Sequence, residues 1–136
     1  MTIIEKMLKI DADDYRGVQN EKMEISRLSE LFGEPFIVEY QPISGRRYQE
    51  IIQSITDKKG NINVGKSFDG NLLIVIAGVV SPDLRDERLL KHFNVATPKD
   101  LAEKLFLGGE ITKLANAITA LSGYGTDEDT DKEIKN

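Results

Sequence analysis

The residues whose spacing most suggests chemistry lie in the segment Gly60–Ser67, which reads GNINVGKS. It matches the pattern G-x-x-x-x-G-K-[ST] of a phosphate-binding loop, in which backbone amides hold phosphates, the lysine contacts the β- and γ-phosphates and the serine binds Mg²⁺. Such a loop follows a buried strand and precedes a helix, whereas the polar segment 54–59 precedes this one. We therefore predict an ordinary loop rich in glycine and asparagine. The alternative hypothesis is a small nucleotide-binding or nucleotide-hydrolysing protein that uses Lys66 and Ser67.

Few residues in this sequence could bind a metal ion or act as a catalytic nucleophile. The chain has no cysteine and one histidine, His92, which excludes disulfides, thiolate metal sites and a two-histidine zinc motif. The segment Asp127–Asp131 spaces its aspartates like the start of a calcium loop, but Lys132 stands where that loop needs glycine. The segment Asp11–Asp14 lacks that glycine as well. We predict no metal site, no cofactor and no catalytic residue, so we do not expect an enzyme.

The length, charge and apolar pattern of the chain limit the classes of protein to which it can belong. Its 136 residues are the size of one ordinary domain, and its net charge of −5 disfavours a nucleic-acid partner. No apolar run approaches the ~20 residues that span a bilayer, and the N-terminal residues lack the regions of a signal peptide. We predict a cytoplasmic protein with no membrane contact. Its single domain covers residues 1–124, and residues 125–136 form an acidic, mobile tail.

Apolar spacing predicts two kinds of element in the N-terminal half. Residues 3–10 favour a short amphipathic helix, and residues 11–20 favour a polar loop. Residues 22–28 and 36–41 alternate apolar and polar side chains around a connector with glycine and proline, so we predict an antiparallel β-hairpin. The period then becomes that of a helix, which begins after Ser44, a suitable N-cap.

The sequence of the C-terminal half predicts a series of helices. The apolar run 72–80 suits a buried strand or a buried helix, and we favour the helix because helix signals follow it. A Ser-Pro and a Thr-Pro pair mark the starts of helices over 82–92 and 98–106, and a last helix ends near Gly123. The predicted fold class is therefore α+β and mostly helical, with an N-terminal antiparallel β-hairpin followed by four or five helices.

Four apolar residues of the last predicted helix lie on one face, with spacings of three, four and three residues. Such a stripe is typical of a helix–helix seam. It can pack against the core of the same chain or serve another chain, and it is our candidate partner-binding surface. Its members are Ile111, Leu114, Ile118 and Leu121.

Several short sequences in a fixed order connect the chain with a known family. They are ISRL at Ile25–Leu28, GEPFIV at Gly33–Val38, AGVVSPDL at Ala77–Leu84, LFLGGEI at Leu105–Ile111 and ITALSGY at Ile118–Tyr124. With these sequences the chain resembles the XkdN-like phage tail assembly chaperones of Gram-positive phages and prophages. The resemblance covers residues 22–124, and the glycine–lysine loop lies in a stretch that does not carry it.

The resemblance implies a non-enzymatic protein that coats the tape measure protein in the cytoplasm of the host bacterium. The chaperone then leaves before the tail is complete, as tail tube protein polymerises around the tape measure protein. Self-association of the chaperone is a further contact that the resemblance suggests. Members of this broader group often have a longer form made by translational frameshifting, with which the acidic tail is compatible. A structural tail component that stays in the virion is the remaining alternative.

Overall fold

The computed structural model describes residues 1–125. This part of the chain contains seven α-helices, two 3₁₀ helices and three β-strands, which confirms the mostly helical α+β class. In chain order the elements are α1 (Ile3–Leu8), η1 (Ala12–Arg16), β1 (Glu21–Glu24), α2 (Ser26–Phe32), β2 (Ile37–Tyr40), α3 (Gly45–Ser54), η2 (Val64–Lys66), α4 (Ser67–Gly78), β3 (Val79–Ser81), α5 (Glu87–His92), α6 (Pro98–Leu105) and α7 (Gly108–Leu121).

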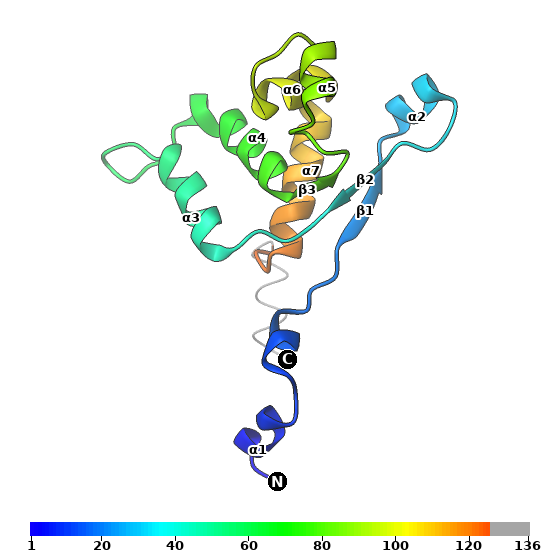
Figure 1. Cartoon of the computed structure of the whole chain (residues 1–136). Coiled ribbons are helices and arrows are strands. Elements are labelled where there is room, and N and C mark those ends of the chain that lie inside the picture. The colour runs from blue at the N-terminus through cyan, green and yellow to red at the C-terminus, as the bar shows by residue number, and fades with distance from the viewer. Residues whose placement is uncertain (126–136) are drawn as a thin grey trace.

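The three strands form one antiparallel sheet in the order β1–β2–β3 (Figure 1). Met23 of β1 pairs with Val38 of β2, so the predicted antiparallel pairing of the two N-terminal segments is confirmed. The predicted hairpin is wrong in two details, because helix α2 occupies the connection and the third strand comes from the middle of the chain. The chain turns into α2 after Ile25 because Ile25 and Leu28, three residues apart, then both lie buried.

Helix α4 is the central helix of the fold and contacts α3, α6 and α7 (Figure 1). Leu72, Ile74, Val75 and Ile76 are buried along it, and Leu73 and Ala77 are half-buried. The helix predicted over residues 72–80 is correct as far as Gly78, where the chain enters β3 and pairs with β2. The apolar run is therefore helical up to Gly78 and continues as a strand at Val79 and Val80.

Helices α4 and α7 cross closely at Gly78. A Cβ atom at this position would lie 2.6 Å from both Cδ1 and Cγ2 of Ile118. Real Cβ atoms do not approach other carbons so closely, so the absence of a side chain at Gly78 lets the two helices meet.

Capping hydrogen bonds confirm the predicted starts of two helices. Ser44 Oγ accepts a hydrogen bond from the Arg47 N–H at the start of α3. Thr97 Oγ1 accepts one from the Asp100 N–H at the start of α6. Side-chain oxygens satisfy N–H groups that have no partner within the first helical turn.

The helix predicted over residues 82–92 begins at Glu87, which corrects its start. The residues before it belong to β3 and then to a turn. In that turn Asp83 accepts hydrogen bonds from the N–H groups of Arg85, through its carboxylate, and of Asp86, through its carbonyl. Sheet pairing and this turn hold the Ser-Pro segment outside the helix.

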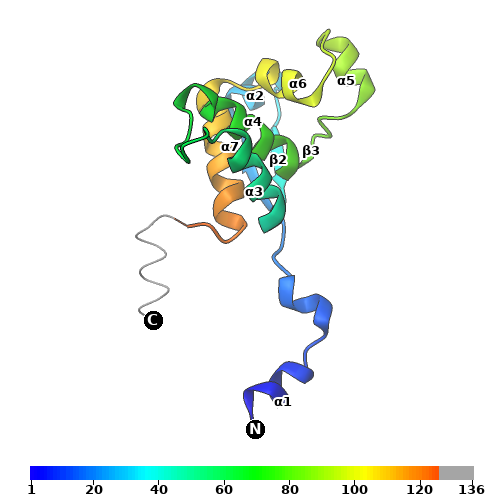
Figure 2. The ribbon, with the colours of Figure 1, turned by 90° about the vertical axis from the view of Figure 1, so that its left-hand side faces the viewer.

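Residues 1–20 form an arm that projects away from the rest of the chain (Figures 1 and 2). We call residues 1–20 the N-terminal arm and residues 21–125 the body. Helix α1 confirms the short helix predicted over residues 3–10, and η1 lies where a polar loop was predicted. Every residue of the arm is exposed. The predicted acidic tail lies outside the described residues, apart from Gly125.

Candidate functional site

The α7 stripe lies inside the folded chain. Ile111, Leu114 and Ile118 each have 0% exposure and belong to the hydrophobic core, with Ile118 at the crossing with α4. Leu121 is half-buried at the end of the helix. The structure thus supports packing of the stripe against its own core. Its use by a partner stays a prediction, and that use would require α7 to leave α4.

Leu121 also lines a hollow where the arm joins the body. Arg16 and Val18 contribute from the arm, and Ile43 contributes from the segment before α3.

The Gly60–Ser67 segment is an exposed loop that ends in η2 and leads into α4. The element before it is helix α3, and the nearest strand-type pairing is a single bridge between Thr56 and Ile62. A phosphate-binding loop connects a strand of a parallel sheet to a helix, whereas the sheet of residues 1–125 is antiparallel. The local structure is an ordinary loop, as predicted.

Backbone amides of this loop are bonded to the chain's own oxygens. The Asp57 carboxylate accepts hydrogen bonds from the N–H groups of Lys59 and Asn61, both at 2.9 Å. Asn63 Oδ1 accepts one from the Gly65 N–H at 2.9 Å. A phosphate cradle needs such amides to point at the ligand, and a carboxylate among them repels a phosphate. The loop is therefore poorly arranged for a nucleotide.

The other residues considered for chemistry do not form a cluster. Among residues 1–125, no group of three or more histidine, aspartate or glutamate side chains is placed to hold a metal ion. Asp11–Asp14 lies exposed at η1, and His92 ends α5. Hydrogen bonds from Arg88 lower the pKa of Asp86 to about 2, but that carboxylate caps α5. The segment Asp127–Asp131 lies outside the described residues.

The N-terminal arm carries a large exposed apolar surface. Its eight large hydrophobic side chains are each about half exposed or more, and Leu8 reaches 79%. They are Met1, Ile3, Ile4, Met7, Leu8, Ile10, Tyr15 and Val18. Large apolar side chains left exposed in such number on one segment are typical of an interaction site.

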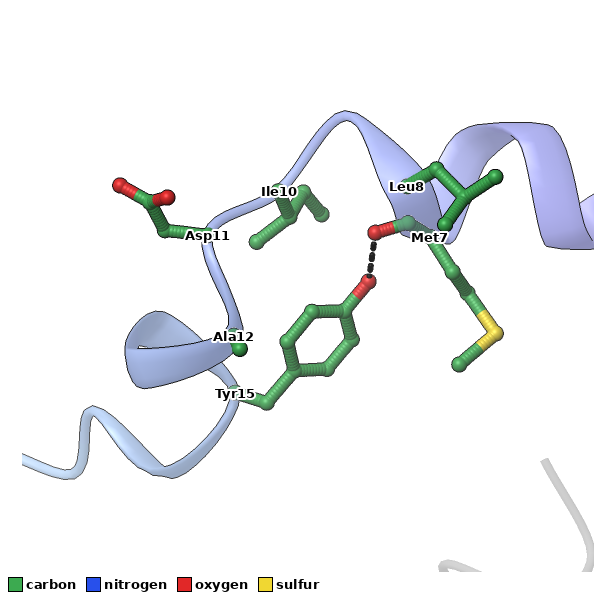
Figure 3. A pocket seen from close by; sticks show the side chains of 6 residues that line it. All are labelled: Met7, Leu8, Ile10, Asp11, Ala12 and Tyr15. Atoms are coloured by element: carbon green, nitrogen blue, oxygen red, sulfur yellow. Dashed lines mark hydrogen bonds between the residues drawn. The ribbon is translucent and has the colours of Figure 1, made fainter.

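The two short helices of the arm hold each other in place (Figure 3). The Tyr15 hydroxyl in η1 donates a hydrogen bond of 2.6 Å to the carbonyl oxygen of Met7 in α1. The side chains of Leu8 and Ile10 line the shallow hollow between the helices. The arm therefore has a defined local structure, in which α1 and η1 contact each other.

A second apolar surface lies on α2 and the residues around it, at the far end of the body from the arm (Figure 1). We call residues 24–37 the α2 knob. Leu31 is 74% exposed, Phe32 is 56% exposed, and Ile37, the first residue of β2, is 42% exposed. The Phe32 ring stacks on Phe36 with its centroid 5.3 Å away, which holds the exposed ring in position.

An ion pair fixes the α2 knob to α7. The Arg27 guanidinium donates hydrogen bonds to both carboxylate oxygens of Glu110, at 2.9 and 3.1 Å, and to the Leu105 carbonyl oxygen at 2.9 Å. The hydrogen bonds from Arg27 hold the pKa of Glu110 below its usual range, although partial burial opposes this shift. Such forked pairing fixes the orientation of the side chains as well as their distance.

Sequence reasoning missed both exposed surfaces. The adjacent pair Leu31–Phe32 in a polar setting was the available signal for the knob. For the arm, the apolar face over residues 3–10 was visible, but spacing alone does not say whether such a face is covered.

The fold of the chain is shared with a protein of known structure. The chain superposes on the crystal structure of the protein YqbN with a TM-score of 0.58, over 84% of this chain and 97% of that one. Sequence identity is 17%, so the likeness establishes a common α+β fold. A comparison with curated proteins gives no match. Among residues 1–125, no helix combines the length and apolarity that crossing a membrane requires.

The chain belongs to the XkdN-like phage tail assembly chaperones. The model of this family matches residues 4–135. The resemblance drawn from residues 22–124 is therefore confirmed, and the match also includes nearly the whole arm. Membership connects the chain with the assembly of bacteriophage tails and with protein partners in that process.

Proposed function

We propose that this chaperone binds the tape measure protein of its phage and keeps it in solution while the tail is assembled. It acts by binding alone, with no chemical step, in the cytoplasm of the host bacterium. One observation carries the proposal. A chain of a tail assembly chaperone family leaves extensive apolar surface outside its core, on the arm and on the α2 knob.

Apolar surface on both partners accounts for the binding. A long helical tape measure protein without its tube exposes apolar stripes, and such stripes promote aggregation. Exposed side chains such as Leu8 and Leu31 can cover them. The net charge of −5 then keeps the complex in solution by mutual repulsion between complexes.

Side chains that are already exposed are better placed for this contact than the α7 stripe. Exposing Ile118 would open the crossing with α4 at Gly78 and remove core contacts. Contacts made on the surface can be released by competition. We propose that tail tube subunits supply this competition as they polymerise around the tape measure protein.

Co-expression tests the proposal. The tape measure protein of the same phage or prophage is produced in bacteria with and without this chain, and its soluble fraction and co-purification are measured. We expect it to be soluble and to co-purify when the chain is present, and to aggregate otherwise. A core-disrupted Ile118→Glu chain serves as the control that should not help. An equally insoluble tape measure protein in the presence of the wild-type chain contradicts the proposal.

Mass spectrometry of purified virions separates a chaperone from a structural tail component. We expect peptides of the tail tube protein and none of this chain, since the chaperone leaves before completion. Recovery of the chain in amounts comparable with a tail protein would favour the structural role instead.

A further inference from the structure

We propose that the α2 knob is the primary docking surface for the tape measure protein, and that it takes an amphipathic helix whose apolar stripe is flanked by lysine or arginine. This inference rests on the proposed function, because that function supplies the partner. It adds which of the two exposed apolar surfaces contributes most of the binding, and which charges the partner helix must carry.

The α2 knob is held in one shape before a partner binds. Gly33 ends α2 with a positive φ of 73°, and its N–H donates a hydrogen bond to the Ser29 carbonyl oxygen. Ser29 Oγ accepts a hydrogen bond of 2.8 Å from the Phe36 N–H and donates one of 2.7 Å to the Glu24 carboxylate. These bonds fix the return of the chain from α2 to β2. Binding therefore requires little ordering of this surface, which favours affinity.

Exposed leucines lie on both sides of the ion pair that attaches the knob to α7. Leu31 follows Arg27 by one helical turn, so the two side chains lie on the same side of α2. The Glu110 oxygen that accepts a hydrogen bond from the Arg27 guanidinium also accepts one of 2.7 Å from the Leu107 N–H. Leu107 is exposed as well. The apolar side chains of α2 and of the start of α7 are thus held near each other.

The exposed apolar side chains in this region suit the stripe of one helix. Four large hydrophobic side chains of the knob and its attachment are each 42% exposed or more, namely Leu31, Phe32, Ile37 and Leu107. An amphipathic helix presents a narrow row of apolar anchors to its partner, and a few residues carry most of the energy of an interface. A tape measure helix therefore finds enough apolar contact here without the arm.

The charges of the knob determine which helix it accepts. Three glutamates of the knob are exposed, namely Glu24, Glu30 and Glu34. Glu24 stands opposite Ile37 in the pairing of β1 with β2, so a carboxylate lies beside an exposed apolar side chain. The single cation of the knob, Arg27, is paired with Glu110. A helix with lysine or arginine beside its stripe is therefore attracted, and a helix with acidic residues there is repelled.

The arm is less suited to be the primary contact. Helix α1 has six residues, none of them buried, and isolated helices shorter than ~12–15 residues are marginal in water. A partner that binds α1 must therefore hold it in its helical form, which costs affinity. Residues 1–20 carry three cations and four acidic side chains. The arm thus favours neither sign of charge in a partner.

Two variants of the full chain test the knob. Leu31→Glu adds a carboxylate to the apolar contact, and Glu30→Lys reverses a charge beside it. Both side chains are exposed, so the core is untouched. The matched controls are Val64→Glu at η2 and Glu50→Lys on α3, which are exposed and lie outside the knob. Circular dichroism and thermal melting check that every variant is folded.

The probe is a purified helical fragment of the tape measure protein of the same phage or prophage. Isothermal titration calorimetry gives its Kd at low and at high salt. We expect Leu31→Glu to weaken binding about tenfold or more, because a charge would enter an apolar contact. Glu30→Lys should weaken binding about threefold at low salt and reduce its dependence on salt. Both controls should bind as the wild type does, and Leu8→Glu in the arm should weaken binding less than Leu31→Glu.

Other results overturn the inference. Binding that survives Leu31→Glu, or that Leu8→Glu weakens just as much, means that the primary contact lies outside the knob. A lower mass of the Leu31→Glu chain itself with unchanged fragment binding, seen by light scattering, means that the knob contacts a second copy instead. Tighter binding by Glu30→Lys means that the partner helix is acidic. A wild-type chain that does not bind the fragment overturns the proposed function as well, so the two failures are distinguishable.

Discussion

Helices α1 and α7 have similar apolar spacing and lie in opposite environments. In α7, Ile111, Leu114 and Ile118 are fully buried in the core, whereas Ile4 and Leu8 of α1 remain exposed. The difference lies in what the rest of the chain places opposite each helix. Glycine at the α4 crossing lets α7 approach closely, and the body places nothing over α1. Helix α7 therefore holds the fold together, whereas the apolar side chains of α1 remain exposed.

The largest expected effect sharpens this comparison directly. Ile118→Glu places an unpaired charge in the core and should lower the free energy of unfolding by about 3–5 kcal/mol, a large part of a typical total of about 5–15 kcal/mol. Ile4→Glu in the arm should change it by no more than about 0.5 kcal/mol. Urea denaturation followed by circular dichroism measures both. Similar losses in the two variants would mean that the arm is part of the folded core.

A smaller effect tests the helix crossing. Gly78→Ala places a methyl group against Ile118, and we expect a loss of about 1–3 kcal/mol from overpacking. Gly109→Ala is the matched control, because no atom lies within 4 Å of its added Cβ and alanine favours a helix. The denaturation midpoints of the two variants are compared with that of the wild type to measure these effects. A neutral Gly78→Ala would mean that α4 and α7 separate readily.

The attachment of the knob should depend on pH. Arg27 lowers the pKa of Glu110 in the folded chain from its ordinary value of 4.5. The pair therefore stabilises the fold fully above that value, and this stabilisation is lost as the pH falls through the lowered pKa. Glu110→Gln should be less stable than the wild type near neutral pH, by less than Gly78→Ala. The gap should close under acidic conditions.

Denaturation midpoints are compared at about pH 7 and about pH 3, on either side of the ordinary pKa of 4.5. A gap of equal size at both values would show that the Glu110 charge does not contribute. Glu103→Gln on α6 is the control, because Glu103 is exposed. Its stability relative to the wild type should be the same at both values.

The smallest effect is expected at the glycine–lysine loop. Its amides already bond to Asp57 and Asn63, so ATP or GTP with Mg²⁺ should leave the melting temperature unchanged. A bound ligand at 100 times its Kd would add about 2.7 kcal/mol. Lys66→Ala should melt as the wild type does. A rise in melting temperature with nucleotide that disappears in Lys66→Ala would establish the nucleotide-binding alternative.

Local signals in the sequence predicted much of the fold. Ser44 and Thr97 were identified as caps because capping depends on residues within one turn. The antiparallel pairing of β1 and β2 followed from their alternation. Features that depend on distant residues were not predictable. The close crossing of α4 and α7 at Gly78 depends on Ile118, and the late start of α5 depends on the pairing of β3 with β2.

The binding surfaces show the same limit. The spacing of the α7 stripe predicted a buried face, but it did not reveal which chain would bury it. The same kind of spacing over residues 3–10 gave no sign that the face would remain open. Only the tertiary structure shows which part of the chain, if any, packs against each apolar face.

Binding of the purified chain to a tape measure fragment, without nucleotide, tests the central claim most directly. The two proteins are mixed, and the mass of the complex is followed by size exclusion with light scattering. We predict a stable complex in the absence of ATP and Mg²⁺, and that complex should dissociate when tail tube subunits are added. No complex, or a complex that forms only with nucleotide, would contradict a chaperone that acts by covering apolar surface.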